Sequence, residues 1–203
     1  MCFYFGLPDS ATVVMKRFQK TIKKPQLFLP SDKYNGFAHP VTAIIASDNK
    51  EQITFGSWGL LPQWSNDMSF RKNTLNARIE TVESLSSFKD YTENRCLVPA
   101  SCFYDWRHEE KFKVPYKIVC TENDIFTFAG LYSDWQHPDT NELLRTYTIL
   151  TTTANITMKY IHNTKQRMPV ILHQIDEQKW LNGDAIAQFA FPYSLGLAAF
   201  KVS

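Results

Sequence analysis

The stretch RCLVPASCFYDW, residues 95–106, contains two short apolar runs separated by Ser101. Their aromatic and β-branched content favours extended chain, so we predict one strand over Arg95 to Pro99 and a second over Cys102 to Trp106. Working outward, the same criteria predict strands at 116–121, 125–134 and 145–153, shorter ones at 1–5 and 168–172, and a hairpin from 41–47 and 52–58. Edge strands are expected from the apolar tail that begins at Phe189.

Helices are predicted to be few and short. Ser10 is placed to cap an amphipathic helix that Pro25 ends. Its apolar face has i, i+4 spacing and consists of Val14, Phe18 and Ile22. Further short helices are expected near 80–88, 155–161 and 176–181, and residues 59–78 are expected to be irregular.

Many strands and few long helices predict an α+β fold: a curved, barrel-like, mainly antiparallel sheet with short peripheral helices. No linker interrupts the chain of 203 residues, so residues 1–203 are expected to form a single domain. With 44% hydrophobic and 21% charged residues, the composition is that of a soluble globular protein rather than a disordered one.

The net charge and the lack of apparent targeting signals argue against a strongly basic nucleic-acid binder, a secreted protein and a membrane protein. A formal net charge of +2 does not mark a strongly basic nucleic-acid binder, so any DNA contact must come from a local patch. No secretory signal is apparent at the start, and no apolar run is long enough to cross a bilayer. We therefore predict a cytoplasmic protein with reduced thiols.

The cysteines divide into one unusual residue and three ordinary ones. Cys96, Cys102 and Cys120 lie in apolar strand-like runs and are expected to be small buried hydrophobes. None of the cysteines forms a Cys-x-x-Cys pair, and neither a metal nor an organic cofactor is predicted. Cys2 differs because removal of Met1 would leave it at the start of the chain.

A terminal cysteine carries two nucleophiles. Its α-amine has an unperturbed pKa of about 7.7–8.0 and its thiol one of about 8.5, so both react near neutrality. The amine attacks an aldehyde to give a Schiff base, and the thiol then closes a five-membered thiazolidine ring. Taken alone, the favoured interpretation of Cys2 is still a chance cysteine at a buried chain end.

Two further residues suit proton transfer. His162 follows a short predicted helix and precedes a strand, and histidine is a general acid or base near neutral pH. A histidine at such a place is more often structural. Asp105 interrupts the apolar run 102–106, where a desolvated carboxylate suits proton transfer. Strand alternation equally permits an aspartate that faces solvent.

A cluster of polar and basic residues lies in the middle of the chain. Asn76 can orient a polar substrate, and Arg78 can grip a phosphate in a bidentate fork. Upstream lies a mixture of aromatic and basic residues typical of a platform for single-stranded nucleic acid: Trp64, Phe70, Arg71 and Lys72. An ordinary solvated loop is the alternative.

Together these residues resemble the SRAP family (SOS-response-associated peptidase). The resemblance covers most of the chain. Each matching segment is weak evidence for the family by itself, whereas all of them in this order are specific to it. The segments are Met1-Cys2, the stretch 58–62 with Trp64, and 76–81, 95–100 and 103–106, then His162 with 167–169. The resemblance implies a curved, barrel-like sheet with peripheral helices and a positively lined groove.

The resemblance also implies a function: covalent capture and protection of abasic sites in single-stranded DNA during the DNA damage response. Cys2, exposed by self-processing or by loss of Met1, would form a thiazolidine with the ring-opened sugar aldehyde. Asn76 would orient Cys2 and the sugar, His162 would promote opening of the deoxyribose, and Asp105 would move protons. The expected DNA contacts are Trp64, Arg71, Lys72, Arg78, Thr151 and Arg167. A monomer in the bacterial cytoplasm, on the nucleoid when DNA is bound, is expected.

Three residues or spacings depart from the family pattern. Asp105 stands where the family usually has glutamate, and its side chain is one methylene shorter. Tyr4 stands where an arginine is usual and cannot replace its charge. The spacing from His162 to Arg167 is longer than the commonest one.

Two other functions fit the same residues. An N-terminal-nucleophile thiol peptidase or amidase would use Cys2 to cleave an amide. A non-catalytic binder of single strands would use the aromatic and basic residues around Trp64.

Overall fold

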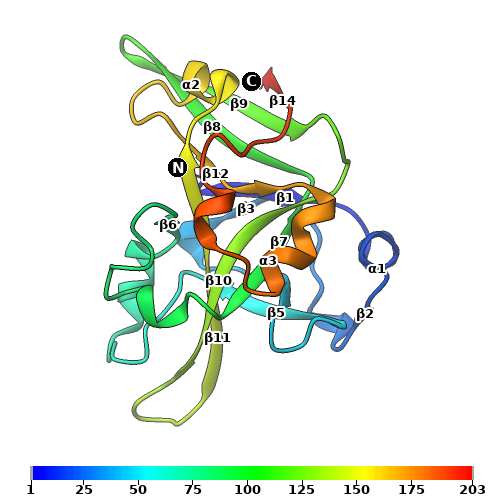
Figure 1. Cartoon of the computed structure of the whole chain (residues 1–203), viewed down its shortest axis with the longest axis vertical. Helices are drawn as coiled ribbons and strands as arrows, with labels where there is room; N and C mark the ends of the chain where they lie inside the picture. The colour runs from blue at the N-terminus through cyan, green and yellow to red at the C-terminus, as the bar shows by residue number, and fades with distance from the viewer. Residues whose placement is uncertain (1, 203) are drawn as a thin grey trace.

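Two β-sheets form the frame of the molecule, which a computed structural model describes over residues 2–202 (Figure 1). The smaller sheet is five-stranded, in the order β14–β9–β8–β1–β3. Its strands, in that order, are Leu197–Lys201, Phe112–Cys120, Cys102–Glu109, Tyr4–Leu7 and Ser31–Asn35. All of its pairings are antiparallel. β14 is the edge strand expected of the apolar tail.

The larger sheet curves until its ends meet. Its order is β12–β11–β10–β7–β4–β5–β2, with bounds Arg167–Pro169, Leu143–Thr153, Phe126–Gln136, Arg95–Ala100, Val41–Ala46, Gln52–Trp58 and Thr21–Ile22. β11 also pairs in parallel with β5 through Thr146 and Ser57, which closes β11, β10, β7, β4 and β5 into a five-stranded barrel. The expected α+β fold with a curved, barrel-like, mainly antiparallel sheet is confirmed.

Two short strands attach to this barrel. β6 (Asn76–Arg78) continues the edge of β11 beyond β5, because Ile149 pairs in parallel with Asn76. β13 (Ile171–Leu172) pairs with β10. Both edges of β11 near Thr151 are therefore occupied, one by β6 and the other by β12.

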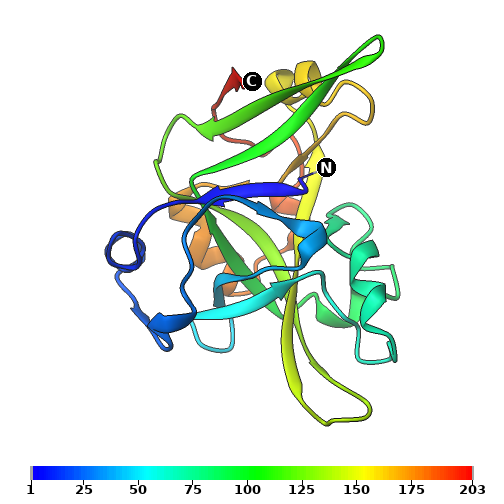
Figure 2. The same cartoon turned by 180° about the vertical axis from the view of Figure 1, so that it is seen from behind.

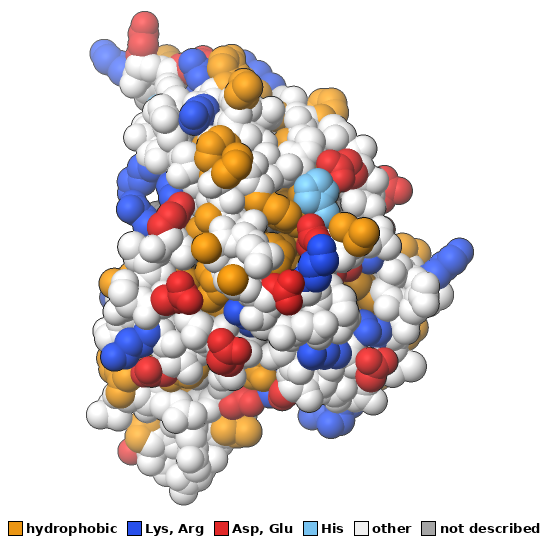
Figure 3. Space-filling view, in the orientation of Figure 1, with side chains coloured by type: hydrophobic (Ala, Val, Ile, Leu, Met, Phe, Trp, Pro, Cys, Tyr) orange, Lys and Arg blue, Asp and Glu red, His pale blue; other side chains and the backbone are white. Residues whose placement is uncertain are grey.

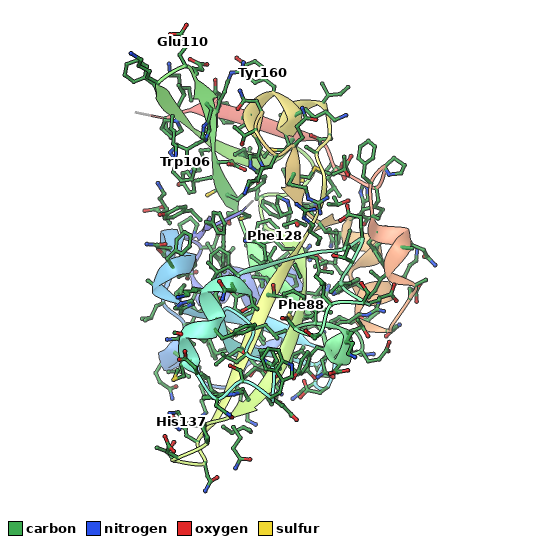
Figure 4. All side chains as sticks on the ribbon, turned by 90° about the vertical axis from the view of Figure 1, so that its left-hand side faces the viewer. Phe88, Trp106, Glu110, Phe128, His137 and Tyr160 are labelled. Carbon is green, nitrogen blue, oxygen red and sulfur yellow. The ribbon has the colours of Figure 1, made fainter. Side chains whose placement is uncertain are left out.

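The core consists of two clusters of buried side chains. Phe5, Phe103 and Phe128 are fully buried in one of them, and Phe128 lies at the centre of the view in Figure 4. The ring of Phe128 lies 5.8 Å from that of Phe5 and 5.9 Å from that of Phe103, both edge-on, a favourable geometry for aromatic pairs. Tyr34 and Tyr193 pack against both clusters.

The helices are short and lie outside the sheets (Figure 1). They are α1 (Ala11–Phe18), α2 (Ile156–Ile161) and α3 (Glu177–Leu181). The Ser10 side chain accepts a hydrogen bond from the Val13 amide at 3.4 Å, which confirms the predicted N-cap. The 3₁₀ turns are η1 (Pro25–Leu27), η2 (Gly36–Ala38), η3 (Met68–Asn73), η4 (Lys89–Tyr91), η5 (Gln174–Asp176) and η6 (Ile186–Phe189). Within residues 2–202, every helix is too short or too polar to cross a membrane.

Two predicted helices differ in the structure. The first ends at Phe18, since Gln19 adopts a left-handed conformation with φ 54°, and Ile22 instead pairs with β5 as part of β2. The second, near 80–88, is replaced by successive turns. Val82 and Phe88 are both buried there, although a six-residue separation puts them on different sides of a helix, so turns bury what a helix could not.

Three strand ends also differ from the prediction. β8 continues past Trp106 to Glu109, and β9 begins at Phe112 rather than Tyr116. The resulting hairpin turns at Glu110, which has φ 50° and lies at the tip in Figure 4. The strand predicted over residues 1–5 begins at Tyr4, and Met1 lies outside the described residues. The extended hairpin matters for function because its polar residues border the candidate site.

Candidate active site

The start of the chain lies where the two sheets meet. β1 pairs with β8 through Tyr4 and Tyr104, so the residues before Tyr4 run alongside β8 toward Asp105. Figures 1 and 2 both place this end of the chain beside β11 and β12 of the larger sheet. The β6–β11 pairing brings Asn76 to the same place, because its side-chain Nδ2 donates to the Cys2 carbonyl oxygen at 2.9 Å.

The amide of Asn76 is only half satisfied. Its Oδ1 is buried and has no hydrogen-bond partner among the described residues. An unpaired buried acceptor costs about 1–3 kcal/mol, so it usually indicates a group that binds there. The bond from Nδ2 to Cys2 fixes the plane of the amide. Oδ1 is therefore held ready to accept a hydrogen bond from a substrate or from a processed chain start.

The side chain of Cys2 is protected from solvent. It is only 1% exposed, and its thiol donates to the Tyr4 carbonyl oxygen, with Sγ and O 3.6 Å apart. Burial raises the pKa of the Cys2 thiol, and the nearby charge of Asp105 also acts to raise it. The thiol is therefore neutral at physiological pH, which suits a group that reacts second rather than one that begins as a thiolate.

Asp105 and His162 form a buried acid–base pair. Both are almost inaccessible, and Asp105 Oδ2 lies 3.6 Å from His162 Nδ1. The Trp106 amide donates to the other carboxylate oxygen, Oδ1, at 2.8 Å, which orients the carboxylate. Of the two interpretations of Asp105, the solvent-facing one is wrong, because the residue is only 6% exposed.

The protonation of His162 follows from its contacts. Its Nδ1 lies 2.9 Å from the Arg167 carbonyl oxygen, and since a carbonyl only accepts, Nδ1 carries the proton. The neutral ring then has its lone pair on Nε2. Burial lowers the pKa of His162 and the charge of Asp105 raises it, with a net decrease from the ordinary value. His162 is therefore neutral, and able to accept a proton, at pH 7.

A docked loop holds His162 in position. Its amide donates to the Met158 carbonyl at 2.7 Å as α2 ends. The Asn163 side chain then exchanges two hydrogen bonds with the backbone of His108, accepting from its amide at 3.1 Å and donating to its carbonyl at 2.9 Å. This reciprocal pattern is the one a neighbouring strand would make, so residues 162–166 cover the open edge of β8.

A second contact fixes α2 against β8. The Arg107 guanidinium lies over the Tyr160 ring at 4.0 Å from its centroid and donates to the Tyr160 carbonyl oxygen. In Figure 4, Trp106 and Tyr160 appear in the same upper part of the molecule, on the β8 strand and the α2 helix. Both contacts join the element that carries Asp105 to the element that carries His162, so the acid–base pair rests on a rigid base.

A cavity of about 320 Å³ opens beside the pair. Its lining combines the two titratable residues with cationic and aromatic side chains: Phe3, Asp105, Trp106, His108, Lys113, His162, Thr164 and Lys165. Sequence analysis identified only Asp105 and His162 of these as site residues. The others carried a weak signal: His108 follows Trp106 by strand alternation, and Lys165 follows His162 closely in the chain. Lys113 lies on β9 and comes beside His108 only through strand pairing.

Several predicted DNA contacts lie on the surface. Trp64 is 52% exposed and packs edge-on against Phe70, with ring centroids 5.1 Å apart. Arg71 is half-buried, and Lys72 and Arg78 are exposed. Phe70, Arg71 and Lys72 lie in η3, against which Trp64 packs, and Arg78 ends the strand that carries Asn76.

Two other predicted DNA contacts are internal. The Thr151 side chain is 0% exposed and its hydroxyl donates to the Ala77 carbonyl at 3.2 Å. Arg167 is 8% exposed; it donates to both carboxylate oxygens of Glu80 at 2.8 Å and to the Thr151 carbonyl at 2.6 Å. β6 and β12 enclose this part of β11, so both side chains have partners within the protein, although Arg167 Nε is buried without one among the described residues. Arg167 ties β12 to β11 and to Glu80, and contact of Thr151 and Arg167 with DNA stays a prediction.

Comparison with known proteins identifies the family. The chain matches the family SOS response associated peptidase (SRAP) over residues 1–203. It is 37% identical over 193 residues to the abasic site processing protein YoqW of Bacillus subtilis, covering 87% of this chain and 83% of that protein. It is 31% identical over 160 residues to the abasic site processing protein HMCES of Xenopus tropicalis, covering 67% of this chain and 47% of that protein.

A solved structure agrees with this assignment. The X-ray crystal structure of a protein from Bacteroides thetaiotaomicron superposes with a TM-score of 0.92 at 33% identity, covering 100% of this chain and 92% of that one. The chain therefore belongs to the SRAP family.

Proposed function

We propose that this protein processes abasic sites in DNA by capturing them covalently in single strands and so protects them during the DNA damage response. The observation that carries the proposal is the meeting of Asn76 with Cys2 beside the buried Asp105–His162 pair. The names of the relatives, abasic site processing proteins, support the class of reaction. The protein would act as a monomer in the bacterial cytoplasm, on the nucleoid when DNA is bound.

The proposed chemistry begins once Met1 is removed. His162 takes a proton from the anomeric hydroxyl of the abasic sugar while the ring oxygen is protonated, which opens the ring to an aldehyde. The Cys2 amine attacks this carbon, and the resulting carbinolamine loses water to give a Schiff base. The thiol then adds to the same carbon and its proton passes to the nitrogen. One thiazolidine and one water result from one aldehyde and one cysteine.

Each neighbouring residue has a part in this sequence. Asp105 moves the protons on which formation and loss of the carbinolamine depend. Asn76 holds the Cys2 backbone through Nδ2, and its unpaired Oδ1 would accept an N–H or O–H from the reacting groups. The raised pKa of the Cys2 thiol fits its place as the second nucleophile. It does not favour a thiol peptidase, whose first step needs a thiolate.

DNA would be held by local side-chain contacts rather than by a positive electrostatic potential over the whole surface. Acidic and basic side chains are interspersed over the face drawn in Figure 3, in keeping with the net charge of +2. We propose that Trp64 stacks on a base and that Arg71, Lys72 and Arg78 contact phosphates.

The test is a cross-linking assay with a fluorescent single strand that carries one abasic site. We expect the wild-type protein to form an adduct that survives denaturation, with an intact mass equal to DNA plus protein without Met1, minus one water. Cys2→Ala should form none without a reductant, whereas Cys120→Ala, which removes another buried cysteine, should react normally. No wild-type adduct, or an equal adduct from Cys2→Ala, would refute the proposal.

A further inference from the structure

The cavity beside the acid–base pair has a cationic side that the proposed chemistry does not use. We propose that Lys113 and Lys165 form a phosphate-binding site that holds a phosphodiester next to the captured sugar, with Trp106 as the wall against which that nucleotide packs. This inference rests on the proposed function for the identity of the sugar and adds a substrate group that the same site recognises.

The position of the two lysines is the first argument. Both residues line the cavity that Asp105 and His162 also line, and the positive charge of Lys165 is close enough to His162 to act to lower its pKa. Its volume of about 320 Å³ lies near the lower end of the roughly 300–1,000 Å³ usual for ligand pockets. A space of that size fits a single sugar-phosphate unit, so a phosphate held by the lysines would belong to the reacting nucleotide or its neighbour.

The balance of charge is the second argument. Neither Lys113 nor Lys165 forms an ion pair with a carboxylate within residues 2–202. The acidic residue in the cavity lining, Asp105, is turned toward His162. Because both side chains are exposed and neither has a carboxylate partner there, they add positive charge to the cavity lining. The cavity therefore favours a negatively charged group.

The rigidity of the supports is the third argument. Lys165 belongs to the loop that Asn163 fastens to the His108 backbone. Lys113 pairs directly with His108 across the β8–β9 hairpin. Both lysines are thus anchored to the same residue of β8, one through a side-chain bridge and one through strand pairing. Their flexible side chains start from fixed backbone positions beside the cavity.

The aromatic lining favours a nucleic acid as the source of the anion. Trp106 is half-buried and lines the cavity beside Phe3. An aromatic side chain and two lysines lining one cavity form a combination that holds single-stranded nucleic acid, by stacking on bases and neutralising phosphates. An isolated inorganic anion would not use this wall.

The test measures binding without the covalent step. A single strand with tetrahydrofuran in place of the abasic sugar has no aldehyde, so its affinity, measured by fluorescence anisotropy, reports contacts alone. We expect Lys113→Gln and Lys165→Gln each to weaken binding about 3- to 10-fold and to reduce the slope of log affinity against log salt by about 0.7. Lys111→Gln, on the same hairpin but outside the cavity lining, should leave both unchanged.

A second arm locates the phosphate. Uncharged methylphosphonate replaces the linkage on the 5′ or the 3′ side of the tetrahydrofuran. On the contacted side, this replacement should make the wild type and the two lysine variants bind alike. Equal affinity and equal salt slope for wild type and variants on natural DNA would overturn the inference. So would lysine effects that persist with both linkages neutral.

The two proposals fail in different ways. If wild-type protein forms no adduct with abasic DNA, the proposed function is lost, whatever tetrahydrofuran DNA shows. If the wild type cross-links normally while the lysine variants bind tetrahydrofuran DNA as the wild type does, only the phosphate site is lost.

Discussion

Asn76 donates a hydrogen bond to the Cys2 carbonyl at 2.9 Å, while its own Oδ1 stays buried and unpaired among residues 2–202. The two residues are 74 positions apart in the chain. One side chain thus links the start of the described chain to the strand β6, and it keeps a buried, unused acceptor on the same amide group. The site is assembled before a substrate arrives.

The first prediction concerns this link. Asn76→Ala removes both the donor to Cys2 and the free acceptor, so adduct formation should slow by about tenfold or more, because small misplacements of reacting groups are costly. The free energy of unfolding should fall by only about 1–2 kcal/mol. Single-turnover gels and urea melts measure the two effects. Asn66→Ala, at an exposed loop position, serves as the control, and an unchanged rate for Asn76→Ala would contradict the role given to it.

The second prediction concerns Asp105. Asp105→Asn keeps the size of the side chain and an oxygen that accepts from the Trp106 amide, but it removes the charge and the ability to transfer a proton. We expect adduct formation to slow by about 10²-fold, the lower end of the usual contribution of a general acid or base. DNA affinity should not fall. Rates followed at saturating DNA test this, and a variant as fast as wild type would exclude Asp105 from proton transfer.

The third prediction is a pH dependence that arises from His162. Because burial lowers its pKa in the folded protein, the unfolded chain takes up a proton first as the pH falls through about 6.5. Stability should therefore decrease over that interval, down to the lower folded pKa. His162→Gln should make this part of the curve less steep, the remaining slope coming from His39, whose pKa burial also lowers. His137→Gln, at the tip of the β10–β11 hairpin (Figure 4), should leave it unchanged. Urea midpoints from about pH 8 to about pH 5 provide the measurement.

The fourth prediction concerns the Glu80–Arg167 pair. Burial acts to raise the pKa of Glu80, but the hydrogen bonds and charge of Arg167 outweigh it and the net shift is downward. The pair therefore stabilises the fold above about pH 4.3, and this contribution is lost as the pH falls through the lower folded pKa.

Glu80→Gln should destabilise the protein by about 1–3 kcal/mol near pH 7, less than for a fully buried pair because the Glu80 side chain is 39% exposed. The difference from wild type should shrink in acid. Glu51→Gln, an exposed acid on the β4–β5 hairpin, is the control. Equal thermal stability of Glu80→Gln and wild type at pH 7 would show that the pair contributes nothing.

The fifth prediction tests whether residues 1–203 form one domain. Tyr34 and Tyr193 pack against both core clusters, so the clusters should lose their structure together. Tryptophan fluorescence and far-UV circular dichroism should give one coincident transition in urea. Two separated transitions would mean that the sheets unfold as independent units.

Local pattern identified most strands but not their ends. The runs within β10 and β11 are rich in aromatic and β-branched residues, and such residues favour strands whatever lies beside them. The hairpin residues beyond Trp106 are polar and lack that signal, and they extend the strand because β8 and β9 pair with each other. Local pattern also failed to predict the turns at 80–88, because the burial of Val82 and Phe88 depends on residues distant in the chain.

The sequence by itself determined the reactive groups and their order: a cysteine at position 2, an amide, a carboxylate and an imidazole, in the arrangement of one family. Only the tertiary structure decided which of them meet. The pairing of β6 with β11 brings Asn76 to Cys2 and encloses Thr151, and the docking of Asn163 on β8 brings Lys165 beside His162. The reason is physical: contacts between distant residues depend on strand register and on which edges are covered, and neither is encoded in local spacing.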